Sequence, residues 1–224
     1  MANYGTGSVT FYSPEHNLIV AILKAYEDLP ENHTANVPEP VLINLVVALD
    51  KNWQRYASIG YDIRDTIFDC SGLQFNTEYK LWYIQISFEF AWNIKPDVFK
   101  VICKDIFKGH VDYVCTGDES AGDYFINTDI NSIFYPWRYY AEITKEDEDA
   151  QRDCFNTKES LINWLRERLH DIILYKNIDQ ADIIAGIKDS MSVKELEDYI
   201  TNILIENCIA YDICTIAEYE TEQI

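Results

Sequence analysis

The chain has 224 residues, of which 48% are hydrophobic and 14% aromatic, and its 38 acidic and 18 basic residues give a formal net charge of −20. This apolar, ring-rich composition excludes a disordered acidic chain and predicts a packed core. No apolar run approaches the roughly eighteen residues needed to cross a bilayer, and the first residues lack a basic and apolar leader. We therefore expect a soluble protein located in the cytoplasm of a host cell.

The negative charge is concentrated late in the sequence. Residues 111–224 hold 25 acidic and 9 basic residues, a net charge of −16, whereas residues 1–110 hold 13 and 9, a net charge of −4. Such a surface repels nucleic acid and anionic membranes and attracts basic protein surfaces. We therefore expect no direct contact with nucleic acid or with a membrane.

The first quarter of the chain predicts a strand followed by two helices. Residues 8–12 are β-branched and aromatic, and Ser13-Pro14 then supplies the cap and the proline that are typical of a helix start. Apolar residues at helical spacing continue to Tyr26, and a second such stripe runs from Pro38 to Tyr56. The segment 60–76 shows no regular pattern.

Residues 80–92 form the strongest strand pattern in the chain. Every even position is large and apolar: Trp82, Ile84, Ile86, Phe88, Phe90 and Trp92. A period of two over this length predicts a long strand with one face fully buried. A third amphipathic helix follows over residues 96–109, where a glycine ends it.

Three further strands are expected over residues 111–115, 124–126 and 135–143, which would continue the sheet as an antiparallel meander. One layer of helices on one face would bury such a sheet. The charged run 145–149 marks a boundary. We therefore predict an α+β domain over residues 1–144, with a helical insertion at about 37–76, and a C-terminal helical subdomain over residues 145–224, whose helices begin at two sequences resembling capping boxes.

No metal-binding pattern is complete. Asn127-x-Asp129-x-Asn131 has the oxygen spacing that opens a calcium loop, but Ser132 stands at the sixth position and Arg138 at the twelfth, where glycine and glutamate are required. The four histidines share no ligand spacing with one another or with a cysteine pair. A polar turn is the better interpretation, and we expect no bound metal.

No catalytic pattern is complete either. The six cysteines are scattered without a C-x-x-C pair, which favours reduced core thiols. Cys103 and His110 could form a nucleophile and its base, but nothing in the sequence orients the histidine. Gly5-x-Gly7 precedes a strand instead of following one, which argues against a phosphate cradle. We therefore predict a protein that is not an enzyme, with no catalytic residues and no cofactor.

The candidate binding residues are two clusters of carboxylates. One surrounds glycine turns and the other surrounds the charged run, and together they comprise Asp118, Glu119, Asp123, Glu142, Glu146, Asp147, Glu148, Asp149 and Asp153. They could form a solvated hairpin and linker. Alternatively, carboxylates on a rigid scaffold could take the places of nucleic-acid phosphates against a basic partner.

The stretch from Phe88 to Pro96, which leads into a helix and then into an acidic strand pair containing Ala121-Gly122, resembles the YubB-like ferredoxin-like domain of phage and plasmid proteins. The resemblance covers about residues 79–143, with residues 8–26 as the first strand and helix. Residues 74–78 depart from the tryptophan- and glycine-containing segment of that pattern. The resemblance implies a ferredoxin-like antiparallel sheet and a mobile-element origin, and it supplies no catalytic residues.

These observations favour an acidic inhibitor that binds a basic nucleic-acid-binding surface of a host defence protein or complex. It would be anti-CRISPR or antirestriction-like and would act as a DNA mimic. Two alternatives stay open. One is a small-ligand-binding protein or enzyme with its site at residues 60–76, and the other is a structural homo-oligomer held by exposed aromatic residues at 135–140.

Overall fold

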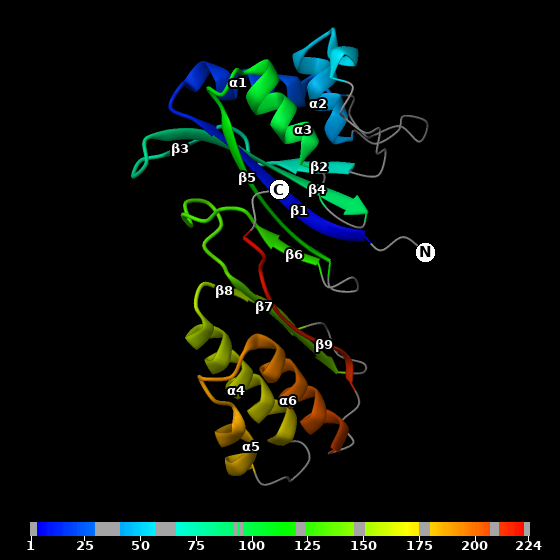
Figure 1. Ribbon diagram of the computed structural model, residues 1–224, viewed down its shortest axis with the longest axis vertical. Helices are drawn as coiled ribbons and strands as arrows, with labels where there is room; N and C mark the ends of the chain where they lie inside the picture. Colours follow the sequence, from blue (N-terminus) through cyan, green and yellow to red (C-terminus); the bar gives the residue numbers. More distant parts are fainter. Residues whose placement is uncertain are drawn as a thin grey trace. The chain divides into compact units, whose positions relative to one another are not determined.

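The computed structural model describes residues 4–29, 41–56, 66–91, 94, 96–119, 124–145, 151–174, 180–206 and 211–221. The chain divides into two compact units. Unit 1 comprises Met1–Asp129 and Thr221–Ile224, and unit 2 comprises Ile130–Glu220. Each unit contains an antiparallel sheet and helices (Figure 1), so the expected α+β class is confirmed.

Unit 1 is built on a six-stranded sheet. Its strands are β1 (Tyr4–Ser13), β2 (Thr66–Cys70), β3 (Gln74–Asn76), β4 (Leu81–Ala91), β5 (Asp112–Glu119) and β6 (Tyr124–Asn127). Their order in space is β2-β4-β1-β5-β6, and β3 also pairs with β4. Every pairing is antiparallel. The long strands β4 and β1 therefore lie side by side in the middle of the sheet.

The period-two pattern of β4 has the predicted consequence. Four of its even positions, Ile84, Ile86, Phe88 and Phe90, are fully buried. The preceding even position, Trp82, is half-buried, and Trp92 lies outside the described residues. Burying a large apolar side chain stabilises a fold by about 1.5–3 kcal/mol relative to leaving it exposed, so this row contributes much of the core.

Helices cover one face of this sheet (Figure 1). They are α1 (His16–Glu27), α2 (Leu42–Leu49), the short 3₁₀ turn η1 (Trp53–Arg55), and α3 (Asp97–Lys100), which continues as the π-helical η2 (Val101–Ile106). Fully buried side chains from α1, α2 and α3, including Ile22, Leu45 and Phe99, join the apolar row of β4 in one cluster. The wider π-helical turns end at a backbone hydrogen bond from the N–H of Gly109 to the carbonyl of Cys103, 2.8 Å.

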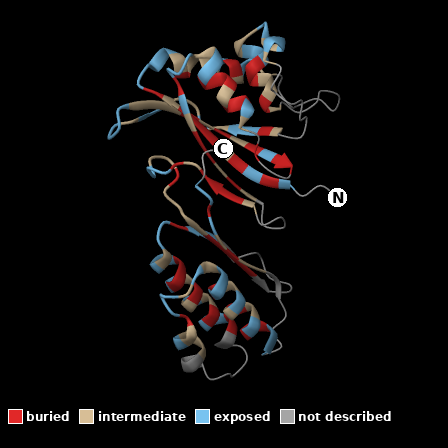
Figure 2. Cartoon of the chain, in the orientation of Figure 1, coloured by how far each residue is buried: buried red, intermediate tan, exposed pale blue. Residues whose placement is uncertain are grey.

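Unit 2 pairs a three-stranded sheet with three helices. The sheet has the order β8-β7-β9, formed by β7 (Tyr139–Lys145), β8 (Gln151–Phe155) and β9 (Tyr211–Glu218). The helices are α4 (Lys158–Leu174), α5 (Gln180–Gly186) and α6 (Val193–Glu206). Alternate strand residues such as Ala141 and Ile216 pack against the helical stripes of α4 and α6 in a second core. Figure 2 shows buried residues recurring along α4 and α6.

Two expectations about the second half need correction. The predicted meander strand at 135–143 became β7, which pairs with β8 and β9 and with no described strand of unit 1. Residues 145–224 are therefore not a purely helical subdomain, and the units divide after Asp129 instead of after residue 144. The physical reason is that β7 finds its main partner, β9, far along the chain, which local sequence patterns do not reveal.

The segment expected to be irregular or helical also contains strands. Residues 66–70 and 74–76 form β2 and β3, both paired with β4, while residues 57–65 lie outside the described part of the chain. The register of β2 shifts between Ile67 and Asp69, which places an irregularity at Phe68. Short, interrupted edge strands of this kind carry little period-two signal, and they limit unwanted pairing at the edge of a sheet.

Candidate protein-binding surfaces

The structure describes the side chains of three of the nine predicted acidic residues. Asp118 is half-buried on β5 of unit 1, whereas Glu142 and Asp153 belong to β7 and β8 of unit 2. The backbone of Glu119 ends β5, with its side chain outside the described part. Five predicted residues lie wholly outside the described residues: Asp123, Glu146, Asp147, Glu148 and Asp149.

Asp153 fits the predicted role of a surface carboxylate, and Glu142 does not. Asp153 is exposed, and its Oδ1 accepts the backbone N–H of Cys154 at 2.8 Å. Glu142 is only 5% exposed, and its carboxylate accepts a hydrogen bond from the buried hydroxyl of Tyr140. These two residues lie two positions apart on β7 and so share one face of the strand. The prediction that Glu142 contacts a partner is therefore wrong, because the side chain is enclosed in the fold.

The negative charge is divided more evenly between the two structural units than between the two halves of the sequence. Unit 2 holds 19 acidic and 9 basic residues, a net charge of −10, and unit 1 holds the same numbers. The apparent concentration beyond residue 110 arises because residues 111–129 and 221–224, which belong to unit 1, hold six acidic and no basic residues. Unit 2 is the shorter of the two, so its charge per residue is still higher.

A row of polar residues on α4 is the clearest acidic surface in unit 2. Glu159, Asn163, Glu167 and Asp171 follow at four-residue intervals and are all exposed. The opposite side of the helix carries the buried residues Leu161, Leu165, Leu169 and Ile172. Four residues advance an α-helix by about 6 Å, so the row spans about 18 Å. We call these four residues the α4 row.

The carboxylates of the α4 row have few partners within the described part of the chain. Asp171 lies 3.7 Å from Nδ1 of His170, and no described basic side chain forms an ion pair with Glu159 or Glu167. The carboxylate clusters predicted from the sequence do not include this row, because its acidic residues are not close together in the sequence. The signal that could have found it is the four-residue spacing of polar side chains opposite a leucine stripe.

Three acidic residues of α6, Glu195, Glu197 and Asp198, are already engaged by hydrogen bonds or ion pairs. Nζ of Lys194 lies 2.8 Å from the carboxylate of Glu197 and 3.2 Å from that of Asp198. Glu195 accepts the backbone N–H of Ser192 at 2.6 Å, which lowers the pKa of its carboxyl group. The Ser192 hydroxyl in turn accepts the N–H of Glu195 at 3.2 Å, so the capping box predicted at the start of α6 is confirmed. At the start of α4 the hydroxyl of Thr157 accepts the N–H of Ser160 at 3.2 Å, so Thr157 is the capping residue in place of the predicted Asn156. The contacts of Glu195, Glu197 and Asp198 stabilise α6 and leave the three carboxylates less available to a partner.

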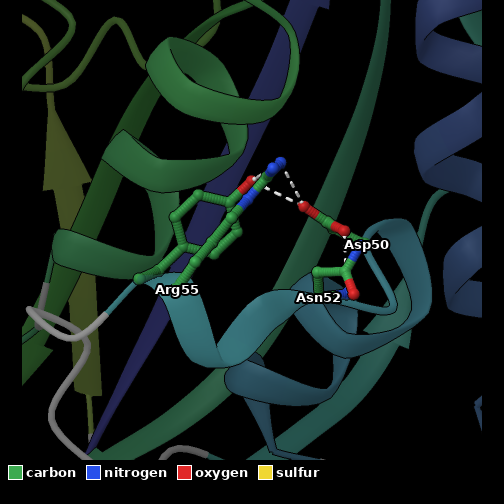
Figure 3. Close-up of polar contacts among 4 residues, drawn as sticks. Asp50, Asn52 and Arg55 are labelled. Carbon is green, nitrogen blue, oxygen red and sulfur yellow. Dashed lines mark hydrogen bonds and ion pairs between the residues drawn. The ribbon is translucent and has the colours of Figure 1, made fainter.

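Asp50 organises a polar cluster between α2 and η1 (Figure 3). One carboxylate oxygen accepts hydrogen bonds from Nη2 of Arg55 at 2.6 Å and from the hydroxyl of Tyr56 at 2.7 Å, and the other accepts the backbone N–H of Asn52 at 2.9 Å. The Asn52 N–H, followed by Tyr56 and Arg55, lowers the pKa of Asp50. The guanidinium carbon of Arg55 also lies 5.0 Å from the centre of the Tyr56 ring. With both oxygens engaged, the cluster closes a turn and is a poor candidate for catalysis.

The residues of the calcium-loop-like sequence and of the Cys103–His110 pair have structural roles. Oδ1 of Asn127 accepts the backbone N–H of Asp129 at 3.0 Å, and the guanidinium of Arg138 donates to the Ser132 hydroxyl at 2.7 Å. Among the described residues, no group of three or more His, Cys, Asp or Glu side chains is arranged to hold a metal ion. Cys103 is buried, which raises the pKa of its thiol.

The proposed partner of that thiol faces elsewhere, and so do the aromatic residues considered for self-association. Nδ1 of His110 lies 3.0 Å from the carboxylate of Glu15, at the start of α1. Tyr135 and Tyr140 are 1% and 3% exposed. The oligomer alternative had relied on exposed rings in this segment, so these two residues do not supply that contact.

An exposed aromatic cluster was also missed. Phe75 on β3 is 44% exposed, and Tyr79 in the turn that follows is 45% exposed. The Phe75 ring lies 4.6 Å from that of Trp82 on the paired strand, and Trp82 lies 4.5 Å from the ring of His16 at the start of α1. Two large rings in an otherwise polar stretch, just before the long strand, were the available sequence signal.

No helix in the described part of the chain is both long and apolar enough to span a membrane. Comparisons of the chain with family models, with curated proteins and with solved structures found no match. The residues and their geometry therefore carry the functional argument by themselves.

Proposed function

We propose that this chain is a non-enzymatic, acidic inhibitor that binds a basic nucleic-acid-binding surface of a host defence protein or complex. Its action would be of the anti-CRISPR or antirestriction kind, by competition with nucleic acid. The observation that carries the proposal is the α4 row, with exposed carboxylates fixed on a helix in a unit of net charge −10. A cytoplasmic location in the host cell follows from the proposed target.

The spacing of the α4 row sets what it could do. Duplex DNA carries one charge per about 1.7 Å of its axis, whereas the row offers three carboxylates over about 18 Å. The row alone therefore covers only part of a nucleic-acid footprint. The predicted group at residues 146–149, with Asp153, would supply further carboxylates. Each exposed charge contact contributes about 0.2–1 kcal/mol, so the affinity must come from the group.

The strand order of unit 1 supports the proposed family resemblance. The segment β2-β4-β1-β5 has the order and the antiparallel directions expected of a ferredoxin-like sheet, with β6 as an added edge strand and α2 as an insertion after α1. We propose on this basis that unit 1 is a ferredoxin-like domain similar to the YubB-like domain of phage and plasmid proteins. A mobile-element origin would suit an inhibitor of host defence, by analogy.

The test is capture of partners from a bacterial host lysate, followed by elution with duplex DNA or with salt. We expect captured proteins to be nucleic-acid-binding, to elute at high salt and to be displaced by DNA, because both ligands would occupy one basic surface. The matched variant carries Glu159→Gln, Glu167→Gln and Asp171→Asn and should capture less. Partners that DNA fails to displace, or that the variant captures equally well, would contradict the proposal.

A further inference from the structure

The exposed rings at the β3–β4 hairpin form a supported series. Phe75 and Trp82 are directly opposite each other in the antiparallel register, and their ring centres are 4.6 Å apart with planes inclined at 45°. Trp82 in turn meets the His16 ring at 4.5 Å and 78°. Phe75 is therefore an exposed ring backed by two others, one from the sheet and one from α1. We call Phe75, Trp82 and His16 the ring series.

Hydrogen bonds fix the hairpin that carries Phe75 and Trp82. Oδ1 of Asn76 accepts the backbone N–H groups of Glu78 and Tyr79, both at 3.1 Å. The turn closes with Lys80 at a φ of 56°. The hydroxyl of Tyr83 donates to the side-chain carbonyl of Gln74, which ties the two strands together. A binding group fixed before contact loses little conformational entropy when it binds.

We infer that the ring series is a docking point for an arginine side chain of the basic partner. Aromatic faces carry negative electrostatic potential and attract cations, and a planar guanidinium can also stack on a ring, which the ammonium of lysine cannot do. Trp, Tyr and Arg dominate the energetic centres of protein interfaces. The inference rests on the proposed function, since it names the partner group that a particular part of the surface recognises.

Charge decides between this occupant and the alternatives. The neighbouring exposed residues Glu78 and Lys80 carry opposite charges, so the hairpin tip is close to neutral, while the whole chain has a net charge of −20. A second copy of the chain would bring another −20 toward the first, and nucleic-acid bases would arrive with their phosphates. Both are repelled, whereas an arginine-bearing segment is attracted by the overall field and by the rings.

The experiment uses two synthetic peptides of equal length and charge, one of alternating glycine and arginine and the other of alternating glycine and lysine. Isothermal titration measures the affinity of each for the full chain at low salt. We expect the arginine peptide to bind about 2–5-fold more tightly, because stacking of the planar guanidinium adds to the cation–π attraction that both cations share. Phe75→Leu keeps an apolar side chain but removes the ring, so it should abolish this preference, with a smaller loss of affinity for the lysine peptide than for the arginine peptide.

A matched control is available on the same sheet. Phe68 on β2 is 57% exposed, and Phe68→Leu should retain the full preference for arginine. Three outcomes would each overturn the inference. The parent could bind the two peptides equally, Phe75→Leu could keep the preference for arginine, or Phe68→Leu could lose it. The variant with Glu159→Gln, Glu167→Gln and Asp171→Asn distinguishes the two proposals. It should lower the affinities of both peptides by the same factor, so that the ratio of the two affinities is unchanged. If it weakens neither, while Phe75→Leu abolishes the preference, the acidic surface fails and the arginine site stands.

Discussion

Gly7 of β1 and Gly117 of β5 face each other in the antiparallel register of the first sheet. A Cβ atom on Gly117 would lie 2.6 Å from Cδ1 of Ile94 and 3.0 Å from Cε1 of Phe90, and one on Gly7 would lie 3.1 Å from Cζ of Phe88. The two missing side chains make room for these apolar groups against the sheet. Gly7, the second glycine of the Gly5-x-Gly7 pattern, thus has a packing role.

Gly117→Ala should lower the free energy of unfolding by about 1–3 kcal/mol, because the added methyl group forces Ile94 and Phe90 out of their packed positions. Urea unfolding followed by circular dichroism measures the change. Gly7→Ala is the graded comparison and should cost less, since its nearest contacts are at 3.1 Å. A Gly117→Ala variant as stable as the parent would show that this site is loosely packed.

Phe88→Ala should cost about 3–5 kcal/mol through loss of buried area and formation of a cavity. Phe88 is fully buried in the middle of β4, with its ring centre 5.9 Å from that of Phe99. The control is Phe68→Ala, whose ring is 57% exposed and which should change stability by about 0.5 kcal/mol or less. A loss below about 1 kcal/mol for Phe88→Ala would mean that the strand is peripheral to the core.

Glu142 should behave differently from the other predicted acidic residues. Glu142→Ala should lower stability by about 1–3 kcal/mol, because it removes a buried acceptor of the Tyr140 hydroxyl. Thermal unfolding checks this. A variant that keeps Glu142 and neutralises the rest of the later cluster should unfold like the parent; its substitutions are Glu146→Gln, Asp147→Asn, Glu148→Gln, Asp149→Asn and Asp153→Asn. If Glu142→Ala is equally stable, its burial has no energetic importance.

The dependence of stability on alkaline pH should report the burial of Cys115. Burial raises the pKa of the Cys115 thiol from 9.0 to about 11, although a hydrogen bond from Thr128 opposes the shift. Above pH 9 the unfolded chain therefore loses this proton first, so the contribution of the neutral thiol to stability is complete below pH 9 and decreases toward pH 11. Serine does not ionise in this range. The difference in the free energy of unfolding between the parent and Cys115→Ser should shrink between pH 9 and pH 11. Urea unfolding at each pH measures this difference, and a difference that stays constant would contradict the prediction.

Local patterns predicted those parts of the fold in which one residue period specifies one environment. The alternation in β4 and the capping box at Ser192 are examples, because both depend on residues a few positions apart. The pairing of Tyr140 with Ala217 could not be found in this way, since it joins β7 to β9 across three helices. The same limit applied to the candidate sites. The sequence does not distinguish the buried Glu142 from the exposed acidic residues around it. Nor does it show that Phe75 packs on Trp82, which in turn contacts His16.

Unit 2 interrupts unit 1 in the sequence, and this has a consequence for the order of events on the ribosome. All described strands of the six-stranded sheet lie before residue 130. That sheet can therefore pair as soon as β6 has emerged, while synthesis continues. The central strand of the second sheet, β7, must wait for β9, which is made only after α4, α5 and α6. Unit 2 should thus become protected from proteases later than the six-stranded sheet of unit 1.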